Sequence, residues 1–285
     1  MKSGIAANLA LLAAVVALGS FVYFKPRGDE PREHALSALK PESVTTIRIE
    51  RNGNEAIVLN RKEDAWFITA PLSVRADPFL VQRVLAFLRA TATHRLAATE
   101  LQRFDLERPR LRVAIDGESF GFGIVNEVSR EQYVLAGGAV YTIDPRYGTA
   151  LPASPEELIS RQLFAPGESP VRIEIGNFTV AQGGGKWTAT PAPVDVSQDD
   201  LARWVDEWRR AVALRVSPYG KDKPQGEIRV ELGNGTRLTL GIIGRAPEFV
   251  LVRPDQQLQY HFLAESAKRL LSPPAAARDE PTGKK

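Results

Sequence analysis

The chain has 285 residues, enough for one large domain or two ordinary ones, and its 44% hydrophobic and 25% charged residues are typical of a globular protein. It contains no cysteine, which excludes disulfides, thiolate zinc sites and thiol catalysis. The net charge of +3 comes from Lys2, Lys25 and Arg27, because the rest carries 34 basic and 34 acidic side chains. Without a basic cluster to displace counterions, we expect no nucleic-acid partner.

An uncharged apolar segment occupies residues 5–24. At about 1.5 Å per residue it is long enough to cross a hydrocarbon core of about 30 Å, so it predicts a transmembrane helix in a lipid bilayer. The alternative is a signal peptide cleaved near Ala17–Gly19, which would release a periplasmic binding protein. We expect an uncleaved, single-pass anchor in a bacterial inner membrane, with the body of the protein in the periplasm.

The remaining chain reads as two copies of one unit. Trp66 and Trp187 each close a short strand, and a proline follows each of them, Pro71 and Pro191. Two further pairs of stretches resemble each other, 111–116 with 228–233 and 122–135 with 240–251. The predicted organisation is a transmembrane anchor at 1–24, a polar stalk at 25–43, a first repeat unit at 44–151, a connecting helix at 152–169, a second repeat unit at 170–272 and a disordered tail at 273–285.

The first unit opens with strands and continues with a helix. Asn52-Gly53 is a strong signal for a hairpin after the strand at 46–50, and a further strand ends at Thr69. Asp77 is a good N-cap, and Pro78 suits the first helical position. The apolar residues that follow at helical spacing are Leu80, Val84, Leu85 and Leu88.

The second unit follows the same plan. Ser197 with Asp200 predicts a capping box, and Trp204, Val205 and Trp208 lie on the apolar face of the helix that follows. A shift of 120 residues places them on Val84, Leu85 and Leu88, so we expect both helices to bury the same face. The tryptophans could line a ligand groove instead, but this spacing favours the core.

Further strands are predicted in both units. They lie near 111–116, 119–125, 131–136 and 139–143 in the first unit and near 227–232, 236–243, 247–252 and 258–262 in the second. A helix from Ser154-Pro155, with Glu157 completing a capping box, is expected to connect the units, and another near 263–271 to close the second. Hairpin-linked strands beside few helices predict an α+β fold with antiparallel sheet, in two tandem copies behind one N-terminal transmembrane helix.

Two glycine motifs could carry chemistry. Gly117 to Gly121 matches G-x-S-x-G around Ser119, but strands are expected on both sides of the serine, and a nucleophile elbow needs a helix after it. Gly183-Gly184-Gly185 also joins two expected strands, whereas a phosphate loop must open a helix. We therefore interpret both motifs as hairpin turns.

Other ionisable residues do not form a recognisable site. His34, His94 and His261 lack metal-ligand spacing. The acidic residues that lie near one another in sequence are expected on a solvated face, and they are Asp105, Glu107, Asp116, Glu118 and Glu127. We expect no catalytic, cofactor-binding or metal-binding residue, and no cofactor.

Taken together, the apolar N-terminal segment, the strand at 44–50, Trp66, Pro71 and the stretch 104–113 resemble the bacterial family called domain of unknown function 4340. In the second unit, Val216 to Gly220 stands in place of the F-x-L element at 104–106. The resemblance implies an accessory part of ABC-type export or another envelope system, and it assigns no catalytic residue.

The expected function is therefore a non-enzymatic, membrane-anchored envelope protein that docks a protein partner. An envelope-polymer hydrolase acting through carboxylates is the alternative from another class, because paired carboxylates can cleave glycosidic bonds.

Overall fold

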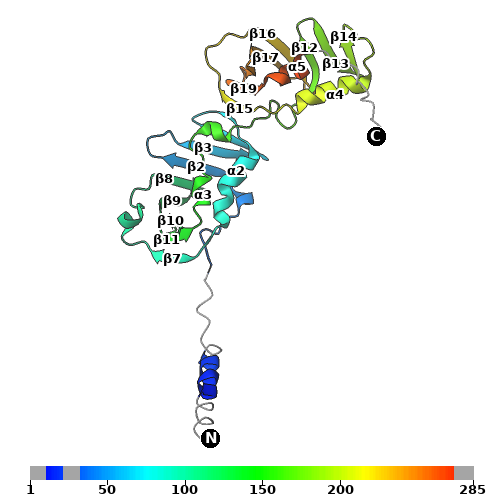
Figure 1. Cartoon of the computed structure of the whole chain (residues 1–285). Coiled ribbons are helices and arrows are strands. Elements are labelled where there is room, and N and C mark those ends of the chain that lie inside the picture. The colour runs from blue at the N-terminus through cyan, green and yellow to red at the C-terminus, as the bar shows by residue number, and fades with distance from the viewer. Residues whose placement is uncertain (1–10, 22–32, 273–285) are drawn as a thin grey trace.

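The computed structural model describes residues 11–21 and 33–272, which form two large antiparallel sheets, each accompanied by a few helices, and one small two-stranded sheet (Figure 1). This α+β arrangement agrees with the expected fold class. Residues 11–21 are helical, and all their side chains are exposed. Parts of the predicted anchor and stalk, and the predicted tail at 273–285, lie outside the described residues. Within those residues, no helix combines the length and hydropathy needed to span a membrane.

The first sheet is built from residues before the connecting segment. Its strands, in order across the sheet, are β5 (Val74–Arg75), β4 (Ala65–Ala70), β3 (Ile57–Lys62), β2 (Thr46–Arg51), β8 (Leu111–Ile115), β9 (Glu118–Val125), β10 (Gln132–Ala136), β11 (Ala139–Ile143) and β7 (His94–Ala97). A separate pair of short strands is formed by β1 (His34–Ala35) and β6 (Thr91–Ala92). The hairpins are formed by local pairing, whereas β2 with β8 and β11 with β7 join distant segments.

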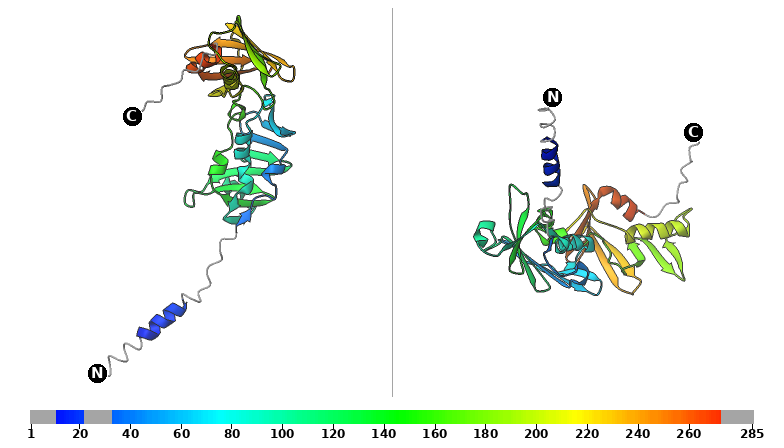
Figure 2. Two further views of the ribbon diagram at one scale, coloured as in Figure 1. Left: turned by 90° about the vertical axis from the view of Figure 1, so that its right-hand side faces the viewer. Right: turned by 90° about the horizontal axis from the view of Figure 1, so that it is seen from below.

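The second sheet has the same order of connections over eight strands. These are β14 (Lys186–Thr190), β13 (Phe178–Gly183), β12 (Pro170–Ile175), β16 (Gly226–Leu232), β17 (Arg237–Gly244), β18 (Glu248–Arg253), β19 (Leu258–Leu263) and β15 (Arg215–Pro218). Strand for strand, they follow the order from β4 to β7 in the first sheet. The sheets occupy different ends of the folded body, and the connecting segment runs between them (Figures 1 and 2).

The strand register fixes which residues correspond between the sheets. Trp66 pairs with Arg61 and Trp187 with Gln182, and each tryptophan is the second residue after the two-residue turn of its hairpin. Following the pairings across both sheets matches Gly121, not Gly123, with Gly241. The same pairings match Ile115, not Val113, with Val230, so the predicted matches of 111–116 with 228–233 and of 122–135 with 240–251 are each wrong by two residues at their start. A two-residue slip keeps every side chain on the same face of a strand, so apolar patterning alone does not detect it.

Two helices begin at the predicted residues. The Asp77 side chain accepts from the amides of Phe79 and Leu80 at the start of α2 (Pro78–Leu85), which continues as the 3₁₀ helix η2 (Ala86–Arg89). Ser197 and Asp200 form the predicted capping box of α4 (Gln198–Arg209). Both helices bury the predicted face, except that Leu80 is only half-buried.

The last helix, α5 (Ala264–Leu271), packs beside α4. The indole N–H of Trp204 donates to the Arg269 carbonyl at 3.1 Å, and that of Trp208 donates to the Leu270 carbonyl at 3.0 Å. These bonds satisfy carbonyls at the end of α5 that have no partner within the helix. The predicted burial of both tryptophans is confirmed, and Trp208 is fully buried. In the first unit the helix after the last hairpin is the short α3 (Arg146–Thr149).

The predicted connecting helix at 152–169 is wrong. Only one 3₁₀ turn forms there, η4 (Pro155–Leu158), and Ser154 makes no side-chain cap. The Glu157 carboxylate instead accepts from the amide of Ala153 at 3.3 Å. Ile159 is extended and pairs with Ala76, so a tertiary backbone bridge stops the helix.

A proline lies over the same place on each sheet. Pro109 follows the 3₁₀ helix η3 (Leu101–Phe104) and covers Gly121, and Pro224 covers Gly241. The segment around Pro224 therefore corresponds to the one around Pro109. Residues 216–220 do not replace the F-x-L element as expected, because they overlap β15, the counterpart of β7. The 3₁₀ turn η1 (Pro41–Ser43) precedes β2.

Candidate functional site

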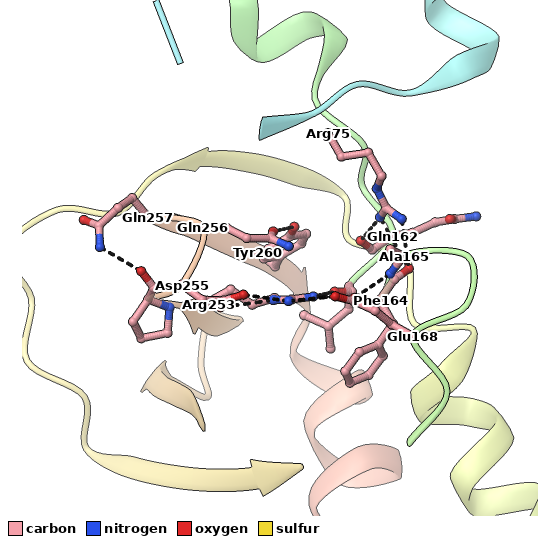
Figure 3. Close-up of polar contacts among 12 residues, drawn as sticks. Arg75, Gln162, Phe164, Ala165, Glu168, Arg253, Asp255, Gln256, Gln257 and Tyr260 are labelled. Atoms are coloured by element: carbon pink, nitrogen blue, oxygen red, sulfur yellow. Dashed lines mark hydrogen bonds and ion pairs between the residues drawn. The ribbon is translucent and has the colours of Figure 1, made fainter. Parts of the chain in front are cut away.

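A buried arginine joins the connecting segment to the second sheet. Arg253, at the end of β18, is 1% exposed and makes five hydrogen bonds (Figure 3). Its Nη1 donates to the Leu163 carbonyl and to Glu168, both at 2.8 Å, and its Nη2 donates to Asp255 at 2.7 Å. The charge is thus paired on both sides, as a buried guanidinium requires.

The ionisation of these groups follows from burial opposed by hydrogen bonds. Burial raises the pKa of Glu168, but bonds from Arg253 and the Ala165 amide outweigh it, and the pKa lies below its usual value. Burial lowers the pKa of Arg253, while Glu168 and Asp255 more than offset this and raise it. Burial also raises the pKa of Tyr260 to about 12. Glu168 and Arg253 therefore remain ionised at neutral pH, with Tyr260 as a neutral phenol.

The same connecting segment is held by the first sheet. Arg75, in β5, donates to the Gln162 carbonyl at 2.9 Å and to the Phe164 carbonyl at 3.3 Å. Burial lowers the pKa of Arg75. The next residue, Ala76, pairs with Ile159. We call Arg75, Glu168, Arg253 and Asp255 the ionic junction, because they tie both sheets to residues 159–168.

The two sheets differ at the edge formed by β4 in one and β14 in the other. In the first sheet, β5 pairs with β4, matching Phe67 with Arg75 and Ile68 with Val74. In the second sheet β14 is the terminal strand, and no strand of residues 33–272 other than β13 pairs with it. Its exposed side chains are Lys186, Thr188 and Thr190, while Trp187 and Ala189 are half-buried.

The hairpin geometry shows which backbone groups lie on the free side of β14. Gly184 and Gly185 have φ of 56° and 78° and form a two-residue turn, with Gly183 opposite Lys186. Hydrogen-bonded and non-bonded pairs alternate from there, so Trp187 and Ala189 direct their N–H and C=O groups away from β13. In the first sheet the corresponding carbonyl, of Trp66, accepts from the Ala76 amide at 2.8 Å.

A serine, a histidine and a glutamate lie together near the other edge of the second sheet. Ser217 Oγ is 3.2 Å from His261 Nε2, and His261 Nδ1 is 2.8 Å from the Glu248 carboxylate. The hydrogen bond from His261 is the largest cause that lowers the pKa of Glu248, and Arg215 adds to it. These distances suit a nucleophile, a base and an orienting acid.

The backbone around this serine is unlike a nucleophile elbow. Ser217 lies within β15, opposite Gln259, and Gln259 Nε2 donates to its hydroxyl at 3.1 Å. A strained strand-to-helix turn, which exposes the serine in hydrolases, does not occur here because β15 continues to Pro218. His261 is only 6% exposed.

A related polar group lies at the matching place in the first sheet. The register places Glu131 on Glu248, Thr142 on His261 and His94 on Arg215. His94 Nδ1 is 3.3 Å from Thr142 Oγ1 and 3.8 Å from Glu131. Each sheet thus joins its last strand, β7 or β15, through a line of polar side chains, which we call the polar seam. Sequence inspection missed it because its members come from three strands whose order was not known.

The two predicted hairpins are confirmed. Ser119 lies in β9, opposite Ala114, and the turn before it has positive φ at Asp116 and Gly117. It is exposed and borders an open depression of about 830 Å³ with Glu107 and Glu118. His261, the downstream histidine, belongs to the other sheet.

The remaining singled-out residues are spread over the surface. Asp116 accepts from the amides of Thr45 and Thr46, so it holds the start of β2. Glu118 accepts from Ser37, and Glu127 is exposed. Asp105 lies 3.6 Å from Arg110, and half-buried His34 is in β1. In the described ranges, 11–21 and 33–272, no group of three such side chains is placed to hold a metal ion.

Comparison with known proteins identifies the family. No curated protein and no solved structure matches the chain. A family model described as Domain of unknown function (DUF4340) matches residues 66–208, from Trp66 in β4 to Trp208 in α4. This region includes β5, the loop in which Pro109 covers Gly121, and the connecting segment, and it amounts to half of the chain. The chain therefore belongs to the DUF4340 family.

Proposed function

We propose that this protein is a non-enzymatic, membrane-tethered envelope protein that docks an extended segment of a protein partner along β14. The observation that carries this proposal is the difference between the two edges, since β5 covers β4 and no strand of the described chain covers β14. An open strand edge offers unpaired N–H and C=O groups for a further strand. The first sheet shows that a short extended segment fits this position.

The tether is supported by residues 11–21. Their helix is apolar all round, and Leu11, Val15 and Phe21 are 57–68% exposed. Such a surface is unfavourable in water and suits a bilayer. We therefore place the apolar segment 5–24 in the bacterial inner membrane as a single-pass anchor, with the body in the periplasm.

The body is best understood as two tandem copies of one unit. Support comes from the common strand order, the matching positions of Trp66 and Trp187, and the matching helices α2 and α4. On the family resemblance, we place the protein among the accessory components of ABC-type export or other envelope systems.

Site-specific photocrosslinking in a producing bacterium tests the docking edge. A photoreactive residue at exposed Thr188 should crosslink to a partner, and one at exposed Thr69, on the β4 strand that β5 covers, is the control. Ala189→Pro should abolish the crosslink, because proline removes an outward N–H without removing a bond to β13. A crosslink that persists with Ala189→Pro, or that is equal at Thr69, would contradict docking along β14.

A separate measurement tests the tether. Alkaline phosphatase fused to the C-terminus is active only outside the cytoplasm, and we expect an active fusion that remains with membranes after a carbonate wash. A well-expressed but inactive fusion would reverse the topology. An active fusion in the soluble fraction would indicate cleavage of the apolar segment.

The second candidate function is a hydrolase, favoured by the hydrogen-bonded line from Ser217 through His261 to Glu248. It differs from the carboxylate mechanism expected from the sequence, because the serine would attack the substrate carbonyl and His261 would take its proton. Labelling of the purified chain by a fluorophosphonate, lost in Ser217→Ala, would establish this activity. An unlabelled wild-type protein would reject it.

A further inference from the structure

A groove of about 520 Å³ lies between α2, η2 and α3 in the first unit. Arg83 and Arg89 of α2 and η2 and Arg146 of α3 line it, and no acidic side chain among residues 33–272 does. Pro41 of η1 and Tyr147 of α3 supply apolar surface. The groove therefore combines an apolar floor with three guanidinium groups.

The second unit has a groove at the equivalent place, between α4 and α5, with a volume of about 650 Å³. Two of the arginines that line it, Arg203 and Arg210, pair with acids on the same helix, α4. Arg203 is 3.1 Å from Asp200, and Arg209 and Arg210 are 2.7 Å and 3.6 Å from Asp206. This groove is an internal reference for the first one.

The acids of α4 have no counterparts on α2. The shift of 120 residues that matches the two helices places Asp200 on Leu80 and Asp206 on Ala86. Arg203, which lines the second groove, corresponds to Arg83, which lines the first. Across residues 33–272, Arg83 makes no salt bridge. The first groove therefore has the cation but not the carboxylate that pairs with its counterpart in the second.

The other two arginines have exposed partners outside α2. Arg89 pairs with Glu42, and Arg146 is 3.5 Å from Asp144. The Arg146 guanidinium also lies over the Tyr147 ring, 4.8 Å from its centroid, and donates to the Tyr147 hydroxyl at 3.0 Å. Three arginines face two partly solvated carboxylates, which leaves the groove positive. Guanidinium groups bind phosphate in bidentate fashion, and they tolerate apolar surroundings better than ammonium groups.

We infer that this groove binds the phosphate headgroup of an anionic membrane phospholipid. The inference rests on the proposed membrane tether. Pro41 follows Phe24, the end of the apolar segment, by seventeen residues, so the groove stays within about 60 Å of the anchor even if that chain were fully extended. Phosphate would meet Arg83 and its neighbours, while the apolar floor would contact the glycerol and first methylene groups. An anionic membrane surface would then orient the first unit.

Titration calorimetry on the full chain in nonionic detergent tests the site. The ligands are short-chain phosphatidylglycerol, short-chain phosphatidylcholine and inorganic phosphate. We expect phosphatidylglycerol to bind the tightest, and Arg83→Gln to weaken it about tenfold, as expected when one charge-assisted contact is lost. Arg203→Gln, the matched change in the second groove, should leave the affinity unchanged. Arg83→Lys should give an intermediate affinity, because it keeps the charge without the bidentate geometry.

Several results would overturn the inference. Equal affinity for the two lipids would show that the site does not recognise the anionic headgroup. Equal affinity for inorganic phosphate and phosphatidylglycerol would show that the lipid part contributes nothing to binding. An equal loss in Arg203→Gln would indicate general charge attraction, and tighter binding of a glutamate-rich peptide would point to an acidic protein segment. Flotation of the wild type with phosphatidylcholine vesicles tests the tether alone, so its failure is distinguishable from failure of the headgroup site.

Discussion

The two sheets have one strand order but different surroundings, and the difference lies at their edges and at the connecting segment. In the first, β5 covers the edge of β4 and leads directly to Arg75 and the connecting segment. In the second, no strand of the described chain pairs with the outer edge of β14. The strand β18 ends in buried Arg253, whose counterpart in the first sheet is Ala136. Two sheets with the same strand order thus differ at one edge: β5 covers it next to the ionic junction in the first sheet, and it is open in the second.

The polar seams give a second comparison. Glu131 and Glu248 occupy matching positions, but Thr142 in the first seam stands where His261 stands in the second. A histidine next to a serine is therefore a feature of the second unit alone, while the acid has a basic neighbour in both, His94 in the first and Arg215 in the second. The shared members favour a role in attaching the last strand.

Truncation of a buried side chain should produce the largest loss of stability, and matched truncations compare the helical segments of the two units. Trp208→Ala should lower the free energy of unfolding by about 3–5 kcal/mol, and its counterpart Leu88→Ala by about 2–5 kcal/mol. Both side chains are buried, and Trp208 also loses its bond to Leu270. Urea denaturation followed by circular dichroism measures both values. A loss below about 1 kcal/mol for Trp208→Ala would place that side chain outside the core.

The ionic junction should follow in size. Arg253→Met should lower the free energy of unfolding by about 3 kcal/mol, because Glu168 loses its cationic partner while remaining partly buried. Adding Glu168→Gln to this variant should recover part of the loss, since an uncharged side chain no longer needs a partner. Denaturation of the single and double variants measures the coupling. No recovery in the double variant would mean that packing, rather than charge, explains the cost.

Acid should remove the contribution of Glu168. Its pKa is lower in the folded chain than in the unfolded chain, so its stabilising effect is complete above the unfolded value near 4.3 and disappears as the pH falls through the folded value. At neutral pH the free energy of unfolding of the wild type should exceed that of Glu168→Gln by about 1–3 kcal/mol. The two free energies should become equal in acid. Urea denaturation at a series of pH values provides the test, and a constant difference would contradict the assignment.

The smallest effect is expected in the seam. Ser217→Ala removes a hydroxyl that contacts His261 and Gln259, and should lower the free energy of unfolding by about 1 kcal/mol. His261→Gln and its counterpart Thr142→Val should cost similar amounts if both seams only attach the last strand. Thermal denaturation compares them. A stable Ser217→Ala variant that loses a cellular function would favour the hydrolase instead.

Local signals in the sequence were enough to predict most elements. Asp77-Pro78 and Ser197 with Asp200 mark the starts of α2 and α4, and the turn glycines mark the hairpins. The short edge strands were missed, because β5 has two residues and β15 ends in Pro218, so neither shows a period. Pairing with a distant strand, not local propensity, makes them strands.

The candidate sites depended on long-range pairing and could not be predicted. Arg253 reads as an ordinary charged residue before a turn, and only the returning connecting segment makes it buried. The groove lined by Arg83, Arg89 and Arg146 forms only because α3 lies beside η2. Arg89 in η2 and Arg146 in α3 are 57 residues apart in the chain. The open edge of β14 is apparent only once β5 is known in the other sheet.

The prolines lying over Gly121 and Gly241 constrain how the family can change. A Cβ at Gly121 would lie 2.9 Å from Pro109 Cγ, and one at Gly241 would lie 2.8 Å from Pro224 Cγ. Neither glycine can acquire a side chain unless the loop above it moves or becomes smaller. Within each unit, glycine and loop should therefore be inherited together: a relative that replaces the glycine should also have replaced its proline or altered the length of that loop.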